Sequence, residues 1–338
     1  MDPLVSIVVD NYNYARFLAA ALDSALAQTH PRVEVVVVDD GSTDDSLAVI
    51  EGYGSRVHPV RRSVNGGQAA ALNAGFAASA GSVVIFLDAD DELYPSAAAD
   101  VVAALGPEVA KVHGALDEVD AAGRPLGRTN PSDAAALAEG DVRPSLLSTG
   151  RYVCPVMSGN AFPRWLLERI LPIPEPEFPS SADGYLVALA GLHGPVAATP
   201  ARLGRYRRHG GNVWGGVPTA TSLGNQSRRE MARYAALRRE AAALGMHVPD
   251  RVDLNDLSGL RTRLASLRLA GGAHPVAGDT RWNLVRAAVR AAWRCADLDT
   301  RRRVVFTAWL LVVGAAPRAL AQRAVTRFYA PPPRAAAA

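Results

Sequence analysis

The chain has 338 residues, 49% of them hydrophobic and 20% charged, which excludes a disordered or fibrous protein and allows one large domain with an appendage or two small domains. Its two cysteines, Cys154 and Cys295, are far apart, so a disulfide framework is excluded and a reducing compartment is expected. The net charge of +3 is the sum of two oppositely charged segments. Residues 1–219 carry 16 basic and 25 acidic side chains, and residues 220–338 carry 20 basic and 8 acidic ones.

Short apolar runs alternate with helix-length segments over the first hundred residues. The apolar runs predict strands at 5–9, 33–38, 57–61 and 83–87. The segments between them predict helices at 15–28, 44–52 and 68–80. This alternation indicates an α/β fold with a mostly parallel sheet and flanking helices on both faces.

Acidic residues follow two of these strands directly. Asp39 and Asp40 come after the second strand, and a cluster from Asp88 to Asp91 comes after the fourth. Ligands of parallel sheets bind beyond the carboxyl ends of the strands, so both groups are expected at one sheet edge. Carboxylates gathered there repel one another unless a cation neutralises them, and oxygen ligands of this kind suit Mg²⁺ or Mn²⁺ with a diphosphate. A solvated acidic loop is the alternative that the residues alone leave open.

The rest of the chain is less regular up to about residue 200 and helical beyond 220. Helices are predicted at 164–170 and 184–192, and a strand at 196–198. The later helical candidates lie near 225–244, 256–270, 281–296, 301–314 and 318–328. We therefore expect an α/β domain over 1–219, a basic helical appendage over 220–330 and a disordered tail over 331–338.

Several motifs occur in an order that resembles one known family, the inverting glycosyltransferases of family 2. They are Asn11-Tyr12-Asn13, Asp39-Asp40-Gly41-Ser42, Asn65-Gly66-Gly67-Gln68, Asp88-Ala89-Asp90-Asp91, Ala182-Asp183-Gly184 and Tyr206-Arg207-Arg208-His209. The resemblance covers residues 4 to about 214. It implies the GT-A fold, a Rossmann-like sheet with flanking helices, with a nucleotide-binding half over 1–110 and an acceptor half over 111–219.

The resemblance also implies roles in donor binding. Asp10 and Tyr12 are expected under the nucleobase, with Tyr12 as a stacking face. Asp40 is expected to bind the base while Asp39 shapes the pocket, and Asp88 to contact the ribose.

A second group of roles concerns the metal and the reaction. By the resemblance, Asp90 binds the metal that bridges the two phosphates, and Asp91 supports it. Arg207 and His209 lie where the family closes a loop over the diphosphate, Arg207 as a donor and His209 as a third metal ligand. Asp183 is the expected general base for the acceptor hydroxyl. A carboxylate at this position also caps the helix that follows, and both roles can hold together.

The basic appendage leaves two explanations open. Arg286, Arg290 and Arg294 repeat every four residues beside an apolar stripe, and the run from Val304 to Val313 is almost wholly apolar. Residues 281–329 either pack against the first domain or a second subunit, or lie on a membrane surface with anionic lipids. The run is too short to span a bilayer, and no nucleic-acid motif accompanies the arginines.

These observations predict a metal-dependent inverting transferase of hexosyl or related sugars. The donor is a nucleotide-diphosphate sugar, with UDP-sugars favoured, and the acceptor is a saccharide or a lipid-linked hydroxyl, as in polysaccharide, glycolipid or other glycoconjugate biosynthesis. The segment after Met1 has no basic region and no signal-length apolar stretch, so we expect a cytoplasmic protein or one peripheral on the inner membrane face. The alternative is a non-catalytic nucleotide-sugar-binding subunit that recruits a partner.

Overall fold

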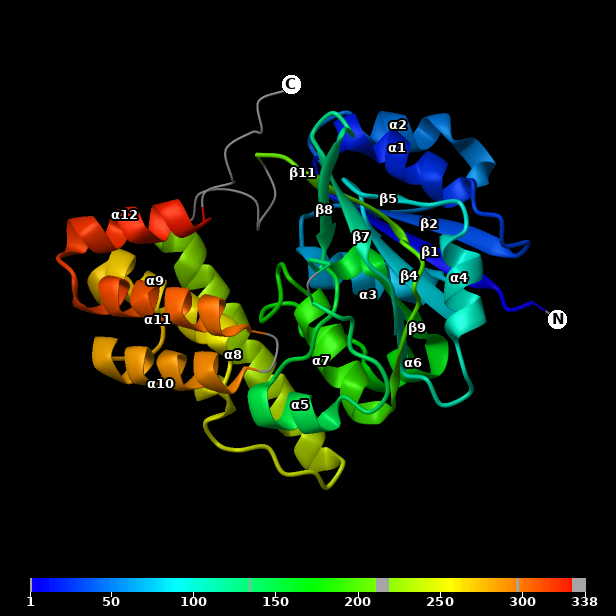
Figure 1. The fold of residues 1–338 in the computed structure, drawn as a ribbon. Coiled ribbons are helices and arrows are strands. Elements are labelled where there is room, and N and C mark those ends of the chain that lie inside the picture. The colour runs from blue at the N-terminus through cyan, green and yellow to red at the C-terminus, as the bar shows by residue number, and fades with distance from the viewer. Residues whose placement is uncertain (1, 134, 211–218, 296–297, 330–338) are drawn as a thin grey trace. The chain divides into compact units, whose positions relative to one another are not determined.

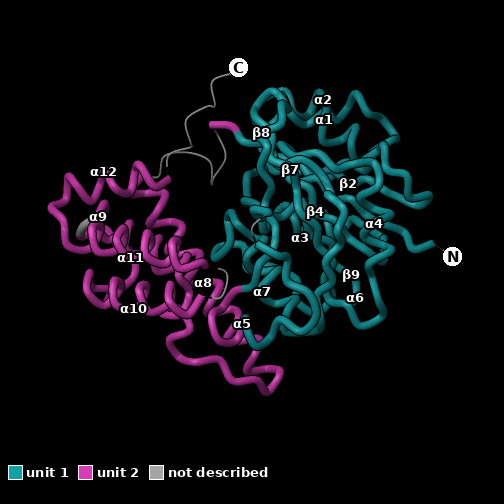
Figure 2. Tube along the Cα trace, viewed as in Figure 1, with its two compact units in different colours: residues 1–146, 152–208 teal, residues 147–151, 209–338 magenta. Residues whose placement is uncertain are grey.

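The computed structural model describes residues 2–133, 135–210, 219–295 and 298–329 (Figure 1). The chain forms two compact units, one of residues 1–146 and 152–208 and the other of residues 147–151 and 209–338 (Figure 2). The first unit therefore ends eleven residues before the boundary that the sequence suggested at residue 219. The predicted tail at 331–338 lies outside the described residues.

A seven-stranded sheet forms the centre of the first unit, in the order β10-β6-β9-β4-β1-β2-β3. Every neighbouring pair is parallel except the two pairs that β9 makes. The predicted mostly parallel sheet is confirmed. Its strands are β1 Val5–Asn11, β2 Val33–Asp40, β3 His58–Arg62, β4 Val83–Asp88, β6 Lys111–His113, β9 Asn160–Pro163 and β10 Val196–Ala198.

Helices cover both faces of this sheet (Figure 1). Alternate residues of β1, such as Val5 and Ile7, pack with Leu18 of α1 and Ile50 of α2 in one core. Val8 faces the other way, where a Cβ at Gly75 of α3 would lie only 2.3 Å from its Cγ1, so glycine permits this close approach. The helices of this unit are α1 Ala15–Leu26, α2 Ser46–Gly52, α3 Gln68–Ala78, α4 Ala97–Ala104, α6 Arg164–Ile170 and α7 Asp183–His193. A further helix, α5 Arg143–Thr149, begins in this unit, and its last three residues belong to the second.

A second sheet of the first unit was not predicted from the sequence. It has the order β5-β11-β7-β8. The short strand β5 pairs antiparallel with β11, and β11 pairs parallel with β7. Both neighbours of β11 therefore come from distant parts of the chain. Its strands are β5 Glu92–Leu93, β7 Leu116–Asp120, β8 Pro125–Asn130 and β11 Gly204–Arg208.

The described part of the second unit is helical, as predicted. Its core is formed by leucine, valine and alanine side chains of α8 to α12, and α9 contacts α8, α10, α11 and α12. Thr219 begins α8 with a capping box in which it exchanges hydrogen bonds with Ser222. Within the described residues, none of the helices combines the length and apolarity needed to cross a bilayer. The helices are α8 Ala220–Ala243, α9 Leu257–Ala270, α10 Arg281–Arg294, α11 Thr300–Ala315 and α12 Arg318–Tyr329.

The single lysine of the chain, Lys111, is buried in β6 of the first unit. Its Nζ donates hydrogen bonds to Nδ1 of His113, at 2.7 Å, and to Oδ1 of Asn160, at 2.6 Å. Nε2 of His113 lies 2.7 Å from the carbonyl oxygen of Ala138, which assigns the ring proton to Nε2. Burial lowers the pKa of Lys111 to about 8, and burial and then the lysine charge lower the pKa of His113 to about 3.

This buried ammonium group makes stability depend on pH in a predictable direction. Below pH 8 both the folded and the unfolded protein carry the proton on Lys111, whereas between pH 8 and 10.5 the folded protein releases it first. The unfolded state then binds more protons, so this residue adds stability as the pH rises, by at most about 1.4 kcal/mol per pH unit. We therefore expect the free energy of unfolding, measured in urea, to rise across this pH range in the wild type relative to Lys111→Met. Parallel stability profiles for the two proteins would contradict the prediction.

Candidate active site

The pairing register brings acidic residues from three strands to one edge of the large sheet. Asp10 at the end of β1 pairs with Asp88 at the end of β4, and Asn11 pairs with Asp39 of β2. Both acidic groups therefore lie at the same carboxyl edge, as predicted. Asp39 and Asp40 are the last residues of β2 and Asp88 is the last of β4, so all three belong to the strands that they were expected to follow.

Three carboxylates at this edge are close enough to share one cation. Ligand atoms of Asp88, Asp90 and Asp91 all lie within 4.8 Å of one another. Oδ2 of Asp91 accepts a hydrogen bond from Oγ of Ser158 at 2.6 Å, and its Oδ1 accepts one from the backbone N–H of Arg207 at 2.9 Å. Ser158 Oγ also accepts a hydrogen bond from the backbone N–H of Asp88. Neutral donors thus fix the positions of the acidic side chains.

The electrostatics of the cluster favour a bound cation. Burial, followed by the charge of Asp90, raises the pKa of Asp10 to about 7. Burial and neighbouring carboxylates also raise the pKa values of Asp88 and Asp91 well above the ordinary range. Oδ1 of Asp10 is buried and has no hydrogen-bond partner among the described residues. An all-oxygen donor set with one unpartnered carboxylate oxygen beside it fits Mg²⁺ or Mn²⁺.

Tyr12 lies at the rim of this edge and is 40% exposed. The turn that carries it is tied to the turn after β2, because the backbone N–H of Asn13 donates a hydrogen bond to Ser42 Oγ at 2.9 Å. Oδ1 of Asn13 accepts a hydrogen bond from the backbone N–H of Thr43 at 2.7 Å. The two turns thus fix each other and leave the ring of Tyr12 open to a planar ligand.

Asp40 is buried and fully engaged with the protein. Its Oδ1 accepts a hydrogen bond from Arg62 Nε at 2.6 Å, its Oδ2 accepts one from Gly67 N at 2.7 Å, and Gly66 N contacts both oxygens. Gly67 has φ +85°, and a Cβ there would lie 2.4 Å from the carbonyl oxygen of Pro179. Asp40 therefore holds the glycine turn before α3, and its contact with a nucleobase stays a prediction.

Asp183 is the first residue of α7 and follows the N-cap residue Ala182, so it does not cap the helix as expected. Its Oδ1 accepts a hydrogen bond from Gly184 N at 2.8 Å. Its charge is one of the causes that raise the pKa of Asp88, so the two carboxylates interact. Gln68 links the same two segments: its Nε2 donates to Asp88 Oδ1 and its Oε1 accepts from Ala182 N, each at 3.0 Å. No role for Gln68 was predicted from the sequence. Its position as a polar residue at the start of a helix, directly after Gly66-Gly67, could have indicated one.

Arg207 lies in strand β11 and is buried, whereas a position in a closing loop was expected. That expectation is wrong because β11 pairs with strands on both sides. Its Nε donates a hydrogen bond to the backbone carbonyl oxygen of Asp90 at 2.9 Å, its guanidinium pairs with Glu92, and it stacks over the ring of Phe17. Arg207 therefore supports the turn that carries the acidic cluster. His209 is the first residue of the second unit after β11, and its role as a metal ligand stays a prediction.

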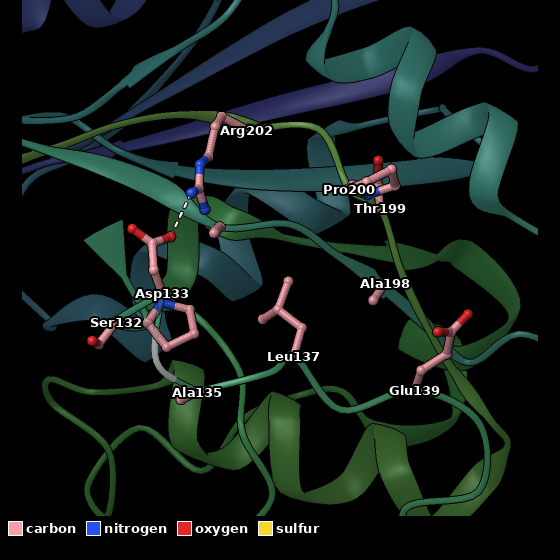
Figure 3. A pocket seen from close by; sticks show the side chains of 11 residues that line it. Ser132, Asp133, Ala135, Leu137, Glu139, Ala198, Thr199, Pro200 and Arg202 are labelled. Carbon is pink, nitrogen blue, oxygen red and sulfur yellow. Dashed lines mark hydrogen bonds and ion pairs between the residues drawn. The ribbon is translucent and has the colours of Figure 1, made fainter. Parts of the chain in front are cut away.

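A pocket of about 360 Å³ opens beyond the carboxyl ends of β6 and β10, on the other side of β9 from the acidic cluster (Figure 3). Leu137 lies in its middle, an ion pair between Asp133 and Arg202 borders one side, and Glu139 and Thr199 lie toward the other. The pocket is therefore at the same sheet edge as the carboxylates and combines polar with apolar walls.

The fold is similar to that of solved glycosyltransferases. Staphylococcus aureus TarS 1–349 in complex with UDP superposes with a TM-score of 0.51 at 15% identity, covering 96% of this chain and 91% of that one. The mannosyltransferase PcManGT from Pyrobaculum calidifontis, in complex with GDP-Man and Mn²⁺, gives 0.52 at 19% identity, covering 97% and 85%. These likenesses establish the GT-A fold that was expected.

Sequence comparison defines the family. Residues 6–152 match the sequence pattern of the family described as Glycosyl transferase family 2. An uncharacterized glycosyltransferase of Nostoc sp. is 38% identical over 224 residues, which are 64% of this chain and 69% of the relative. A similar protein of Rickettsia prowazekii is 40% identical over 95 residues, 28% of this chain and 30% of that one. The chain belongs to glycosyltransferase family 2 and is an enzyme of the glycosyltransferase class.

The contacts of Asp40 predict a clear loss of stability on truncation. In Asp40→Ala, the guanidinium of Arg62 and two backbone N–H groups lose their acceptor, which we expect to cost about 3 kcal/mol in thermal or urea unfolding. The neighbouring pair of Arg61 with Glu51 supplies the control, because these side chains are 51% and 60% exposed. Glu51→Ala is expected to cost less than about 1 kcal/mol. Equal losses in the two variants would contradict this account of Asp40.

Proposed function

We propose that the protein is a metal-dependent inverting glycosyltransferase that moves a sugar from a nucleotide-diphosphate donor to an acceptor hydroxyl. The observation that carries the proposal is the register that places Asp10 opposite Asp88, beside Asp90 and Asp91 and within electrostatic reach of Asp183. The donor class is supported by similar structures, since TarS was solved with UDP and with UDP-GlcNAc and PcManGT with GDP-Man. We favour a UDP-sugar for this chain.

In this proposal the nucleotide lies across the carboxyl ends of β1 and β2. The exposed ring of Tyr12 stacks on the nucleobase. Such stacking accepts any of the bases, because every base has a π-face. Asp10, Asp39 and Asp40 border the base, while Asp88 accepts hydrogen bonds from the ribose. Since the oxygens of Asp40 already accept four contacts from the protein, its part is to fix the turn at the base of the pocket.

The same edge would hold the divalent cation. Asp90 is the proposed ligand, Asp91 supports it, and His209 is the proposed third ligand. When bound, Mg²⁺ or Mn²⁺ supplies Lewis-acid stabilisation of the leaving diphosphate. Arg207 acts indirectly, because its Nε holds the backbone of Asp90 and its own backbone N–H holds Asp91.

The reaction is a single displacement at the anomeric carbon. Asp183 accepts the proton of the acceptor hydroxyl while that oxygen forms a bond to the anomeric carbon. The bond from this carbon to the diphosphate oxygen breaks at the same time, and the nucleoside diphosphate leaves with the electron pair. Attack from the opposite face inverts the anomeric configuration. The hydrogen bond from Gly184 N to Asp183 Oδ1 fixes the carboxylate for this task.

The acceptor is proposed to approach from the side of β6 and β10, where the pocket of Figure 3 opens. Its polar side chains suit the hydroxyl groups of a saccharide, and Leu137 suits the apolar face of a sugar ring. A saccharide or a lipid-linked hydroxyl fits this proposal, in the synthesis of a polysaccharide, glycolipid or other glycoconjugate at the cytoplasmic side of the cell membrane.

Replacing the proposed base tests the reaction directly. Asp183→Asn keeps the size and an acceptor for the N–H of Gly184 but cannot take a proton, so transfer should fall by about 10²–10⁴-fold with donor affinity unchanged. Gln68→Ala removes the link between Asp88 and Ala182, and we expect an intermediate loss on the order of tenfold because the base is less well positioned. Transfer is measured with Mn²⁺ and a panel of sugar nucleotides. If the wild type binds donors but never turns them over, the proposal is wrong and the chain is a non-catalytic nucleotide-sugar-binding subunit.

Replacing the proposed metal ligand tests the site separately from the chemistry. Asp90→Ala should abolish the Mn²⁺-dependent part of UDP binding in calorimetry, while the far-UV spectrum stays that of the wild type. Glu168→Ala, an exposed carboxylate on α6, is the matched control and should bind as the wild type does. Unchanged Mn²⁺-dependent binding in Asp90→Ala would overturn the metal assignment.

A further inference from the structure

The second unit exposes most of the large apolar side chains that the described chain presents to solvent. In this unit their exposure is greatest for Val305 at 58%, Val304 at 54%, and Trp282 and Leu320 at 51% each. Single exposed apolar residues are ordinary, but a group on adjacent helices indicates an interaction surface. The group on α10 to α12 consists of Trp282, Trp293, Val304, Val305, Leu311, Val312 and Leu320. We call it the apolar patch.

These helices form one layer in which α11 lies between α10 and α12 (Figure 1). Trp293 of α10 donates its indole N–H to Thr307 of α11, and Trp309 of α11 donates its own to the carbonyl oxygen of Ala324 of α12, both at 3.1 Å. The inner sides of the helices carry the buried core of this unit. The apolar patch therefore lies on the outer side of a preformed layer, apart from the residues that stabilise the unit.

Arginines surround the apolar patch, and acidic residues are nearly absent. Among the described residues of 281–329 there are ten arginines and a single acidic residue, Asp299, which caps α11. Eight of the arginines are exposed and pair with no carboxylate in the described part of the chain. They are Arg281, Arg286, Arg290, Arg294, Arg301, Arg318, Arg323 and Arg327.

One face of α10 shows how the two kinds of side chain are combined. Trp282, Arg286, Arg290 and Trp293 follow one another at intervals of four, four and three residues, all exposed, so they line a single side of the helix. Tryptophan combines an apolar ring with a polar N–H and prefers the boundary between lipid and water. Arginine binds phosphate through its planar fork of donors.

We propose that the outer side of the α10–α12 layer docks on a membrane surface rich in anionic phospholipids. The apolar side chains of α11, from Val304 to Val312, enter the boundary between headgroups and acyl chains, while the surrounding arginines bind lipid phosphates. This mode requires helices that lie in the plane of the surface.

The charge pattern favours lipid over the other occupants. Two copies of this chain joined symmetrically through the patch would place arginines of one copy near arginines of the other, with few carboxylates to offset them. A nucleic acid would satisfy the arginines but leave the valine and leucine stripe of α11 in water. An anionic lipid surface satisfies both components at once.

Sedimentation with vesicles tests the proposal on the full chain. We expect binding to vesicles of phosphatidylcholine and phosphatidylglycerol in equal parts, weaker binding at high salt, and little binding to phosphatidylcholine alone. Arg286→Gln/Arg290→Gln/Arg294→Gln should lower the affinity at least about tenfold. Arg56→Gln/Arg61→Gln/Arg169→Gln removes the same charge from exposed positions of the first unit and should bind as the wild type does. Equal binding of both triple variants would overturn the proposal.

Fluorescence locates the contact. Lipids with brominated acyl chains should quench the tryptophan emission of the wild type, whereas Trp282→Phe/Trp293→Phe should bind vesicles but lose most of the quenching. Unfolding temperatures of all variants are compared first, because these exposed side chains should alter stability little. A wild type that dimerises through this face, with the dimer lost in the arginine variant and no vesicle binding, would assign the surface to a second copy instead.

The membrane inference can fail independently of the proposed function. Donor binding and hydrolysis of a soluble sugar nucleotide should be the same in the wild type and in the patch variants, since the patch belongs to the second unit and the acidic cluster to the first. Loss of vesicle binding with these activities retained is the expected result.

Discussion

The mutual repulsion of the carboxylates at the end of β1 and β4 is the constraint on which the first unit depends. Asp10 and Asp88 face each other because of strand register alone. They stay in place because neutral groups, such as the hydroxyl of Ser158 and the amide of Gln68, donate to the cluster without discharging it. The second sheet contributes to the same end, since β11 delivers a backbone N–H to Asp91. Much of the architecture around this edge thus holds several carboxyl groups together where a cation and a diphosphate can use them.

Local patterns predicted five of the seven strands of the large sheet, the helices between its first four strands and the gathering of aspartates, because burial and parallel topology leave periodic signals in the sequence. They missed β6 and β9 of that sheet and the whole second sheet. Strand β5 has two residues, and β11 is a run rich in arginine whose pairing partners lie far away in the chain. Such pairing is decided by tertiary contacts that no short window contains. The position of Arg207 was misjudged for this reason.

The same limit applies to side-chain partners at the site. Asp40 could be recognised as a residue of the sheet edge, but its attachment to Arg62 and to Gly66-Gly67 depends on how three segments meet. The role of Gln68 likewise depends on the return of the chain at Ala182, more than a hundred residues later. The sequence shows which residues could take part in chemistry. Which of them are free to contact a ligand, and which hold the scaffold in place, is decided only by the folded chain.

The burial of Lys111 has a consequence for how the protein can be handled and modified. Because this is the only lysine in the chain, and its ammonium group is enclosed by His113 and Asn160, the folded protein offers no lysine to acylating enzymes or to amine-directed cross-linkers. A reagent that reacts with primary amines would reach this side chain only when the sheet around β6 opens. The rate of covalent labelling at this one residue therefore reports how often the sheet around β6 opens.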